Sequence, residues 1–316
     1  MDLNLLDRRH IERVHGTIFL CFTLVVCLAA TFAEGHTTNR SDATDADDKG
    51  TVPDTLEWRR NYAAAYAEAK RERKMLLVEF VPDDGSGLER QLDGYIDKDE
   101  SLKRRMRLMV LARLPHDYES DVPGIKGALV KHSAFKHLSG QTGIVIIDLR
   151  DPDAPYYGKV VTALPFSRGK YYHWQPSELK VALELPPGTI TQRTMIWAVR
   201  IHPESPASTT GTLNPALAEA ATQHSGYQAR IQVQGHQGWE SRFHQVRSAA
   251  NANDAKEVVA ESWPNENLID SCIDCVDSWR HSPGHWNAVR GRHRLFGYDI
   301  RSGRNGIWYG TGIFAD

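Results

Sequence analysis

The feature that most constrains the fold is an alternation of apolar runs with amphipathic segments between residues 56 and 185. Residues 75–81, MLLVEFV, and residues 142–149, TGIVIIDL, are short and almost wholly apolar, which is typical of strands buried on both faces. Residues 56–74 place their apolar side chains at helical spacing. Strands that alternate with helices predict an α/β layer architecture.

A break in this pattern lies at residues 185–189, LPPGT, where two prolines and a glycine cannot continue a helix. We therefore expect one domain over residues 55–187 and a second over residues 188–316. The sequence after the break predicts helices at 194–201, at 214–231 with Pro215 in the first turn, and at 267–279, and two strands joined by a hairpin at 295–301 and 307–314.

The N-terminus has the order of a secretory signal. Arg8, Arg9 and Arg13 precede an apolar run over residues 16–33 that ends in small residues. We expect residues 1–33 to be a signal peptide cleaved after Ala33, with an uncleaved membrane anchor as the alternative. Residues 34–54 are polar and predict a disordered linker. Both alternatives make the protein extracytoplasmic: periplasmic, secreted, or attached to the membrane through this segment alone.

Charge and cysteine content exclude other classes. The formal net charge is -2, which argues against a nucleic-acid partner. Beyond the N-terminal segment the chain has only Cys272 and Cys275, so it is not a disulfide scaffold. These two lie at i and i+3 in a helical pattern, where they are either small core residues or a local thiol pair.

Residues 58–80 resemble the thioredoxin-like superfamily in the pattern W..NY..A...AK...K.LLVEF. The redox motif of that superfamily follows the strand, but here the corresponding residues 81–88, VPDDGSGL, contain no cysteine. Dithiol exchange needs a thiolate and a resolving thiol. The resemblance therefore implies a thioredoxin-like domain without redox activity.

The second half resembles the CAP superfamily, which comprises cysteine-rich secretory proteins, antigen 5 and pathogenesis-related proteins. The segments that carry this resemblance occur in order: LNPALAEAATQHSGYQA, QGHQGW, VVAESW, CVDSWRHSPGHWNAV and FGYDI followed by IWYGTGIF. The resemblance implies a CAP-type α-β-α sandwich after the thioredoxin-like domain.

In the CAP superfamily, histidines and acids converge in a cleft that often holds a divalent metal. By position they correspond here to His236, Glu261 and His285, which suit zinc or another divalent cation and leave one coordination position open. Ser282 stands where other members have a second acid. We expect the Pro283–Gly284 pair to stop a helix and aim His285 into the cleft. The alternatives are that His236 is only a loop histidine, that Glu261 only braces the fold, and that the His285 ring is only packed between Trp279 and Trp286.

These residues favour a protein that binds an extracytoplasmic ligand or protein partner over an enzyme. One alternative is a hydrolase that uses a metal-activated water with Glu261 as general base. Another is an interaction protein whose cleft is vestigial. Ser282 and His285 also suggest a nucleophile, but the sequence identifies no oxyanion donor.

Overall fold

A computed structural model describes residues 55–82, 87–120 and 126–316. The predicted signal peptide or anchor and the predicted linker lie outside the described residues, and so does the centre of the VPDDGSGL segment. Residues 53–316 form one compact unit by their internal contacts. None of the helices among the described residues combines the length and the hydropathy that a membrane span requires.

The first half is built on a mixed five-stranded sheet with the strand order β1-β3-β2-β4-β5. β3 is parallel to both β1 and β2, whereas β4 is antiparallel to β2 and to β5. The strands are β1 (Trp58–Arg59), β2 (Met75–Val81), β3 (Val110–Pro115), β4 (Gly143–Asp148) and β5 (Val160–Pro165).

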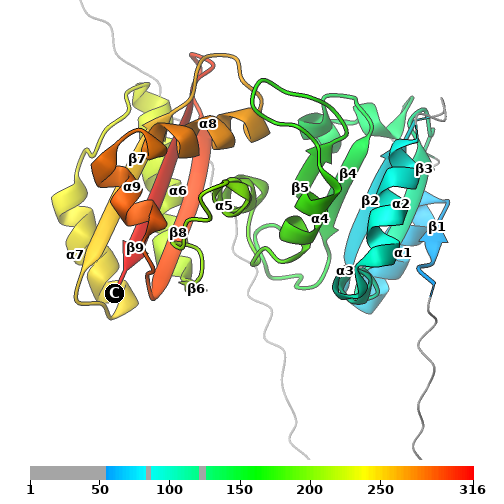
Figure 1. Ribbon diagram of the computed structural model, residues 1–316, viewed down its shortest axis with the longest axis horizontal. Helices are drawn as coiled ribbons and strands as arrows, with labels where there is room; N and C mark the ends of the chain where they lie inside the picture. The colour runs from blue at the N-terminus through cyan, green and yellow to red at the C-terminus, as the bar shows by residue number, and fades with distance from the viewer. Residues whose placement is uncertain (1–54, 83–86, 121–125) are drawn as a thin grey trace, which may run out of the picture. The chain divides into compact units, whose positions relative to one another are not determined.

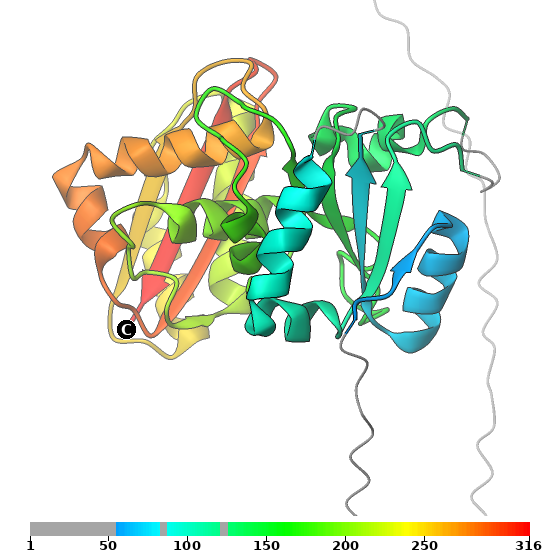
Figure 2. The same ribbon diagram turned by 45° about the vertical axis from the view of Figure 1, so that its right-hand side comes forward.

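Helices cover both faces of this sheet, and Figure 2 shows α1 and α2 on opposite sides of it. Alternate residues of β2 explain the two layers: Val78 packs with α1, while Leu77 packs with α2 and α3. The helices are α1 (Tyr62–Glu72), α2 (Leu88–Lys98), α3 (Glu100–Met106) and α4 (Pro176–Leu183), with short 3-10 turns at Leu129–Lys131 and Ser133–Leu138.

The second half is built on a four-stranded sheet with the order β6-β8-β9-β7. β9 is antiparallel to both β7 and β8, and β6 is parallel to β8. These strands are β6 (Thr212–Leu213), β7 (Ala255–Glu261), β8 (Leu295–Ser302) and β9 (Trp308–Ala315).

Helices also cover both faces of the second sheet (Figure 1). One face packs against α5 (Ile190–Ile201), α8 (Leu268–Arg280) and α9 (Pro283–Arg290). The other packs against α6 (Pro215–Ile231) and α7 (Trp239–Ala250). Phe314 faces the first group of helices and Ile313 faces the second, as strand periodicity requires.

The core of the second half continues across the predicted domain boundary. Leu164 and Tyr172, which precede LPPGT, belong to the same buried cluster as Trp197 of α5. Arg193 of α5 is 2% exposed, and its guanidinium donates hydrogen bonds to the carbonyls of Val161, Ala182, Leu185 and Pro186. The division into two separately folding domains stays a prediction.

The predicted α/β class is confirmed, while membership of the thioredoxin-like and CAP superfamilies stays a prediction. The helix expected before Pro283 does end, at Arg280, but the expected break is wrong in one respect. Pro283 is the first residue of α9, where its missing N–H costs nothing. His285 therefore lies in the first turn of a new helix. Sequence analysis did not predict α2 or α7.

Candidate functional site

Two histidines that are far apart in sequence face each other in the second half of the chain. His236 lies in the connection between α6 and α7, and His285 lies in the first turn of α9. Their Nε2 atoms are 3.3 Å apart, and their ring centroids are 5.5 Å apart. The predicted convergence of these two residues is therefore present in the structure.

A buried carboxylate orients the first of these rings. Glu257 of β7 has a side chain that is 0% exposed, and its Oε1 lies 2.9 Å from Nδ1 of His236. Arg242 of α7 donates from Nε to the other carboxylate oxygen at 2.7 Å. A carboxylate only accepts hydrogen bonds, so Nδ1 of His236 carries a proton, and in the neutral ring Nε2 is an acceptor for a hydrogen bond from Nε2 of His285.

The loop that carries His236 is anchored to α6 from the preceding residue. The backbone N–H of Gly235 donates to Gln228 Oε1 at 3.0 Å, and the Gly235 carbonyl lies 2.9 Å from His224 Nε2. Gln228 is itself fully buried and donates to Thr311 of β9 at 3.1 Å. Both polar backbone groups of Gly235 are therefore hydrogen-bonded to α6, which fixes the position of the adjacent His236.

Burial favours the neutral form of the second histidine. The pKa of His285 is lowered from its ordinary value, first because burial penalises the charged ring and second because His236 lies beside it. Burial also lowers the pKa of His224, against the opposing attraction of Glu257. A neutral imidazole is the form that binds a cation, so the lowered pKa of His285 keeps it available below the usual pH.

The other predicted site residues are Glu261 and Ser282, and among the described residues neither side chain forms a hydrogen bond or ion pair with this pair. Glu261 is exposed, and among the described residues no side-chain hydrogen bond or ion pair joins it to either histidine. Ser282 is the N-cap residue of α9, and its side chain makes no capping hydrogen bond. Its backbone carbonyl accepts from Trp286 N at 2.8 Å. The carboxylate that contacts His236 is Glu257.

The choice between the two acids is set by burial. Glu257 and Glu261 are four residues apart on β7, so their side chains point to the same face of the sheet. Spacing alone cannot distinguish them. Glu257 lies beneath α7, within reach of Arg242, while Glu261 is at the end of the strand. Sequence analysis missed the Arg242–Glu257 pair, because it did not predict α7, which carries Arg242.

His236 and His285 are the two side chains at this position that could hold a metal ion. Within residues 55–82, 87–120 and 126–316, no group of three or more His, Cys, Asp or Glu side chains is arranged to hold a metal ion. Two ligands of a tetrahedral zinc ion, each at ~2.0–2.1 Å, lie about 3.4 Å from one another. The 3.3 Å separation of the His236 and His285 nitrogens matches that spacing. The pair fits half of a tetrahedral site.

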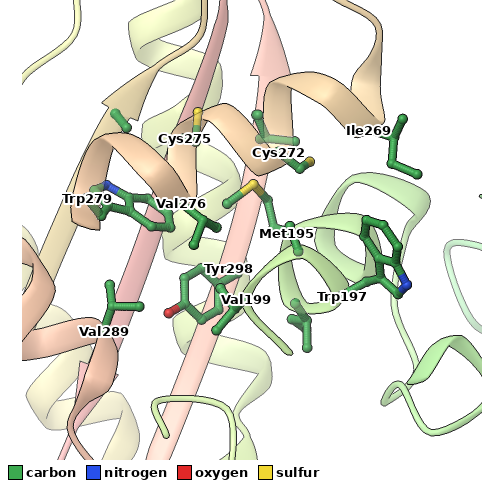
Figure 3. Close-up of a cluster of buried hydrophobic side chains, with 14 of the residues drawn as sticks. Met195, Trp197, Val199, Ile269, Cys272, Cys275, Val276, Trp279, Val289 and Tyr298 are labelled. Atoms are coloured by element: carbon green, nitrogen blue, oxygen red, sulfur yellow. The ribbon is translucent and has the colours of Figure 1, made fainter. Parts of the chain in front are cut away.

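The predicted thiol pair is buried and unbonded. Cys272 and Cys275 are free thiols on α8 and are each 0% exposed. Figure 3 shows that the two sulfur atoms do not point toward one another. Burial raises the pKa of both thiols well above the ordinary value, which suppresses the reactive thiolate. Their surroundings are those of core residues.

No protein-family model and no curated protein sequence matches this chain. Among solved structures, the chain is similar to an outer surface protein from Borrelia burgdorferi. The sequence identity is 14%, the TM-score is 0.27, and the match covers 34% of this chain and 77% of that protein. A likeness of this size carries no statement about the fold or function of the present chain.

Proposed function

We propose that this chain is an exported binding protein that captures its ligand through a divalent metal held by His236 and His285. Export is supported by the basic residues and the apolar run of residues 1–33. Metal binding is supported by a single observation: two imidazole nitrogens face each other at 3.3 Å, and a buried carboxylate orients one of the rings.

Proton positions make this arrangement suited to a cation. With the His236 proton directed at Glu257, the Nε2 lone pair of His236 points at Nε2 of His285. When His285 carries its proton on Nε2, it donates a hydrogen bond to Nε2 of His236; when it carries the proton on Nδ1, two lone pairs face each other and repel. A divalent cation coordinated by both imidazoles would remove this repulsion. Glu257 also orients His236, because the hydrogen bond to Nδ1 fixes the tautomer and the direction of the ring.

A metal ion held by only two protein side chains needs further ligands from outside the protein. The remaining coordination positions of the metal go to water or to a donor atom of the ligand. The side chain of His236 is 43% exposed, so a ligand has access to this position. We infer a ligand that carries a carboxylate, an imidazole or another lone-pair donor, and whose affinity depends on the metal.

The test is calorimetric titration of zinc into the full chain and its variants. We expect His236→Ala and His285→Ala each to weaken zinc binding by at least tenfold. Glu257→Gln should weaken it by roughly 10–100-fold, the effect of removing a group that orients a ligand. His281→Ala is the matched control, since this exposed histidine pairs with Asp277. Glu261→Gln should leave the affinity unchanged.

The pH dependence gives an independent readout. Protons compete with the metal for imidazole, so the affinity falls as the pH falls. Because the pKa of His285 is lowered, this fall should begin at a lower pH than for an ordinary histidine pair. Zinc affinity that is equal in the wild type and His285→Ala, or that His281→Ala reduces as much, would overturn the proposal.

The other two functions remain predictions without a specific observation in their favour. Within the described part of the chain, Glu261 contacts neither histidine, and Glu257 is already bound by Arg242 and His236. A hydrolase screen with and without chelator tests the metal-dependent hydrolase. Absence of both zinc binding and hydrolysis would favour the interaction protein with a vestigial cleft.

A further inference from the structure

A cavity of about 610 Å³ shares no residue with the histidine pair. Its walls come from the loop that precedes α4, from the C-terminal end of α5 and from α8. The volume lies within the range of small-molecule sites, ~300–1,000 Å³. The apolar part of the lining consists of Ala198, Ile201, Pro203, Ile273 and Val276.

One carboxylate lies in the buried part of this cavity. Glu178 of α4 is 9% exposed, and its Oε2 accepts a hydrogen bond from the Gln175 N–H at 3.3 Å. Among the described residues, no donor is recorded for Oε1 of Glu178. Burial raises the pKa of Glu178 to about 7, because a charged carboxylate is poorly solvated there. The ionised form therefore lacks a counter-charge.

The other ionisable groups of the cavity do not supply that counter-charge. The ammonium of Lys170 is bound to Glu266 at 2.8 Å and lies over the Trp263 ring. The Tyr172 hydroxyl donates to the Pro165 carbonyl. Burial lowers the pKa of His202, which keeps that ring neutral. The remaining ionisable groups are Tyr171, His173 and Asp277.

We propose that this cavity binds a small organic amine, with its ammonium group on Glu178 and its apolar body against α5 and α8. The ligand cation supplies the charge that the buried carboxylate lacks, and charge-assisted hydrogen bonds of this kind are among the strongest. The apolar lining requires an aliphatic or aromatic body rather than a bare ion. This site is independent of the metal and ligand proposed at His236 and His285.

The experiment compares three ligands of the same shape and different charge by calorimetry: 3-phenylpropylammonium, 3-phenylpropan-1-ol and 3-phenylpropanoate. The wild-type chain at pH 8 should bind the cation at least tenfold more tightly than the alcohol, and the anion least. Glu178→Gln should reduce the preference for the cation to less than twofold. The substituted amide retains an oxygen acceptor for the Gln175 N–H, so the helix cap is preserved. Asp277→Asn, at the exposed rim, is the matched control and should change the affinity less than threefold.

The pH profile tests the same carboxylate. With the pKa of Glu178 at about 7, the ionised fraction and hence the affinity for the cation should rise about tenfold from pH 6 to pH 8. Glu178→Gln should lose this rise, and a rise that persists undiminished in Glu178→Gln would contradict the proposal. If Glu178→Gln does not fold, Ile273→Trp fills the cavity from α8 and should abolish binding.

Equal affinities for the cation and the alcohol would overturn the proposal, and so would a cation affinity that Glu178→Gln leaves unchanged. Either result would mean that Glu178 serves only as the cap of α4.

Discussion

Replacing Arg193 by methionine should destabilise the whole compact unit, because this side chain joins α5 to the first half of the chain. Its guanidinium is 2% exposed and has no carboxylate in hydrogen-bond contact among the described residues. It donates instead to four backbone carbonyls and to the Thr162 hydroxyl at 2.8–3.2 Å. Methionine fills much of the same volume and supplies no donor.

The expected magnitude follows from two opposing effects. Each buried acceptor that loses its donor costs ~1 kcal/mol or more, and four carbonyls and one hydroxyl are affected. Removing a buried charge recovers part of its desolvation cost, which is several kcal/mol. We expect a net loss of ~2–4 kcal/mol in the free energy of unfolding, since the buried acceptors left without a donor outweigh the recovered desolvation cost.

Urea denaturation followed by circular dichroism measures this loss, with Arg200→Met as the control. Arg200 is on the same helix and donates to the Glu184 and Thr209 carbonyls, but it is only half-buried. It should cost less than ~1 kcal/mol. A loss for Arg193→Met within error of the control, or a gain in stability, would refute the reasoning.

The contribution of Arg193 to the free energy of unfolding changes with pH in a direction that follows from its pKa. Burial lowers the pKa of Arg193 to about 10 from its ordinary value of 12.5. Because the folded-state pKa is the lower one, the folded state releases its proton first as the pH rises, and its relative stability increases only above about pH 9. Between pH 6 and pH 8 the group is charged in both states. The destabilisation by Arg193→Met should therefore be constant over that range.

Two further predictions follow from the packing of the second half. Residues 188–316 alone should still unfold cooperatively, because they contain the whole β6-β8-β9-β7 sheet and its helices. The urea midpoint should be lower than that of the full chain, because Trp197 loses its contacts with the cluster that includes Leu164 and Tyr172. A non-cooperative transition would show that the halves share an obligatory core. In protein that starts at residue 53, Cys272 and Cys275 should not react with Ellman's reagent until urea unfolds the chain, and rapid labelling of the native state would contradict their burial.

Local pattern was sufficient for much of the fold. The apolar runs predicted β2 and β4, and Pro215 with the helical spacing behind it predicted α6. These features depend on side chains near one another in sequence, so a short window contains their cause. The helix α7 was missed because a polar segment with one apolar stripe resembles a loop until its partner sheet is known.

The candidate site, like the fold, could be predicted only in part from the sequence. The approach of His236 to His285 was expected from a family resemblance and is present in the structure, whereas local pattern could not have supplied it. The acid beside them is Glu257, and that selection required knowing which end of β7 lies under α7.

The sequence by itself determined where many helices and strands form, among them β2, β4 and α6, and which residue types were available for a site. Tertiary structure alone decided which of two equivalent acids on β7 meets His236, and that Arg193 and Glu178 are buried. The physical reason is the distance along the sequence over which each kind of interaction acts. Periodicity and capping act over a few residues, but burial and charge pairing depend on segments brought together from distant parts of the chain, and these set which ionisable groups lack a partner.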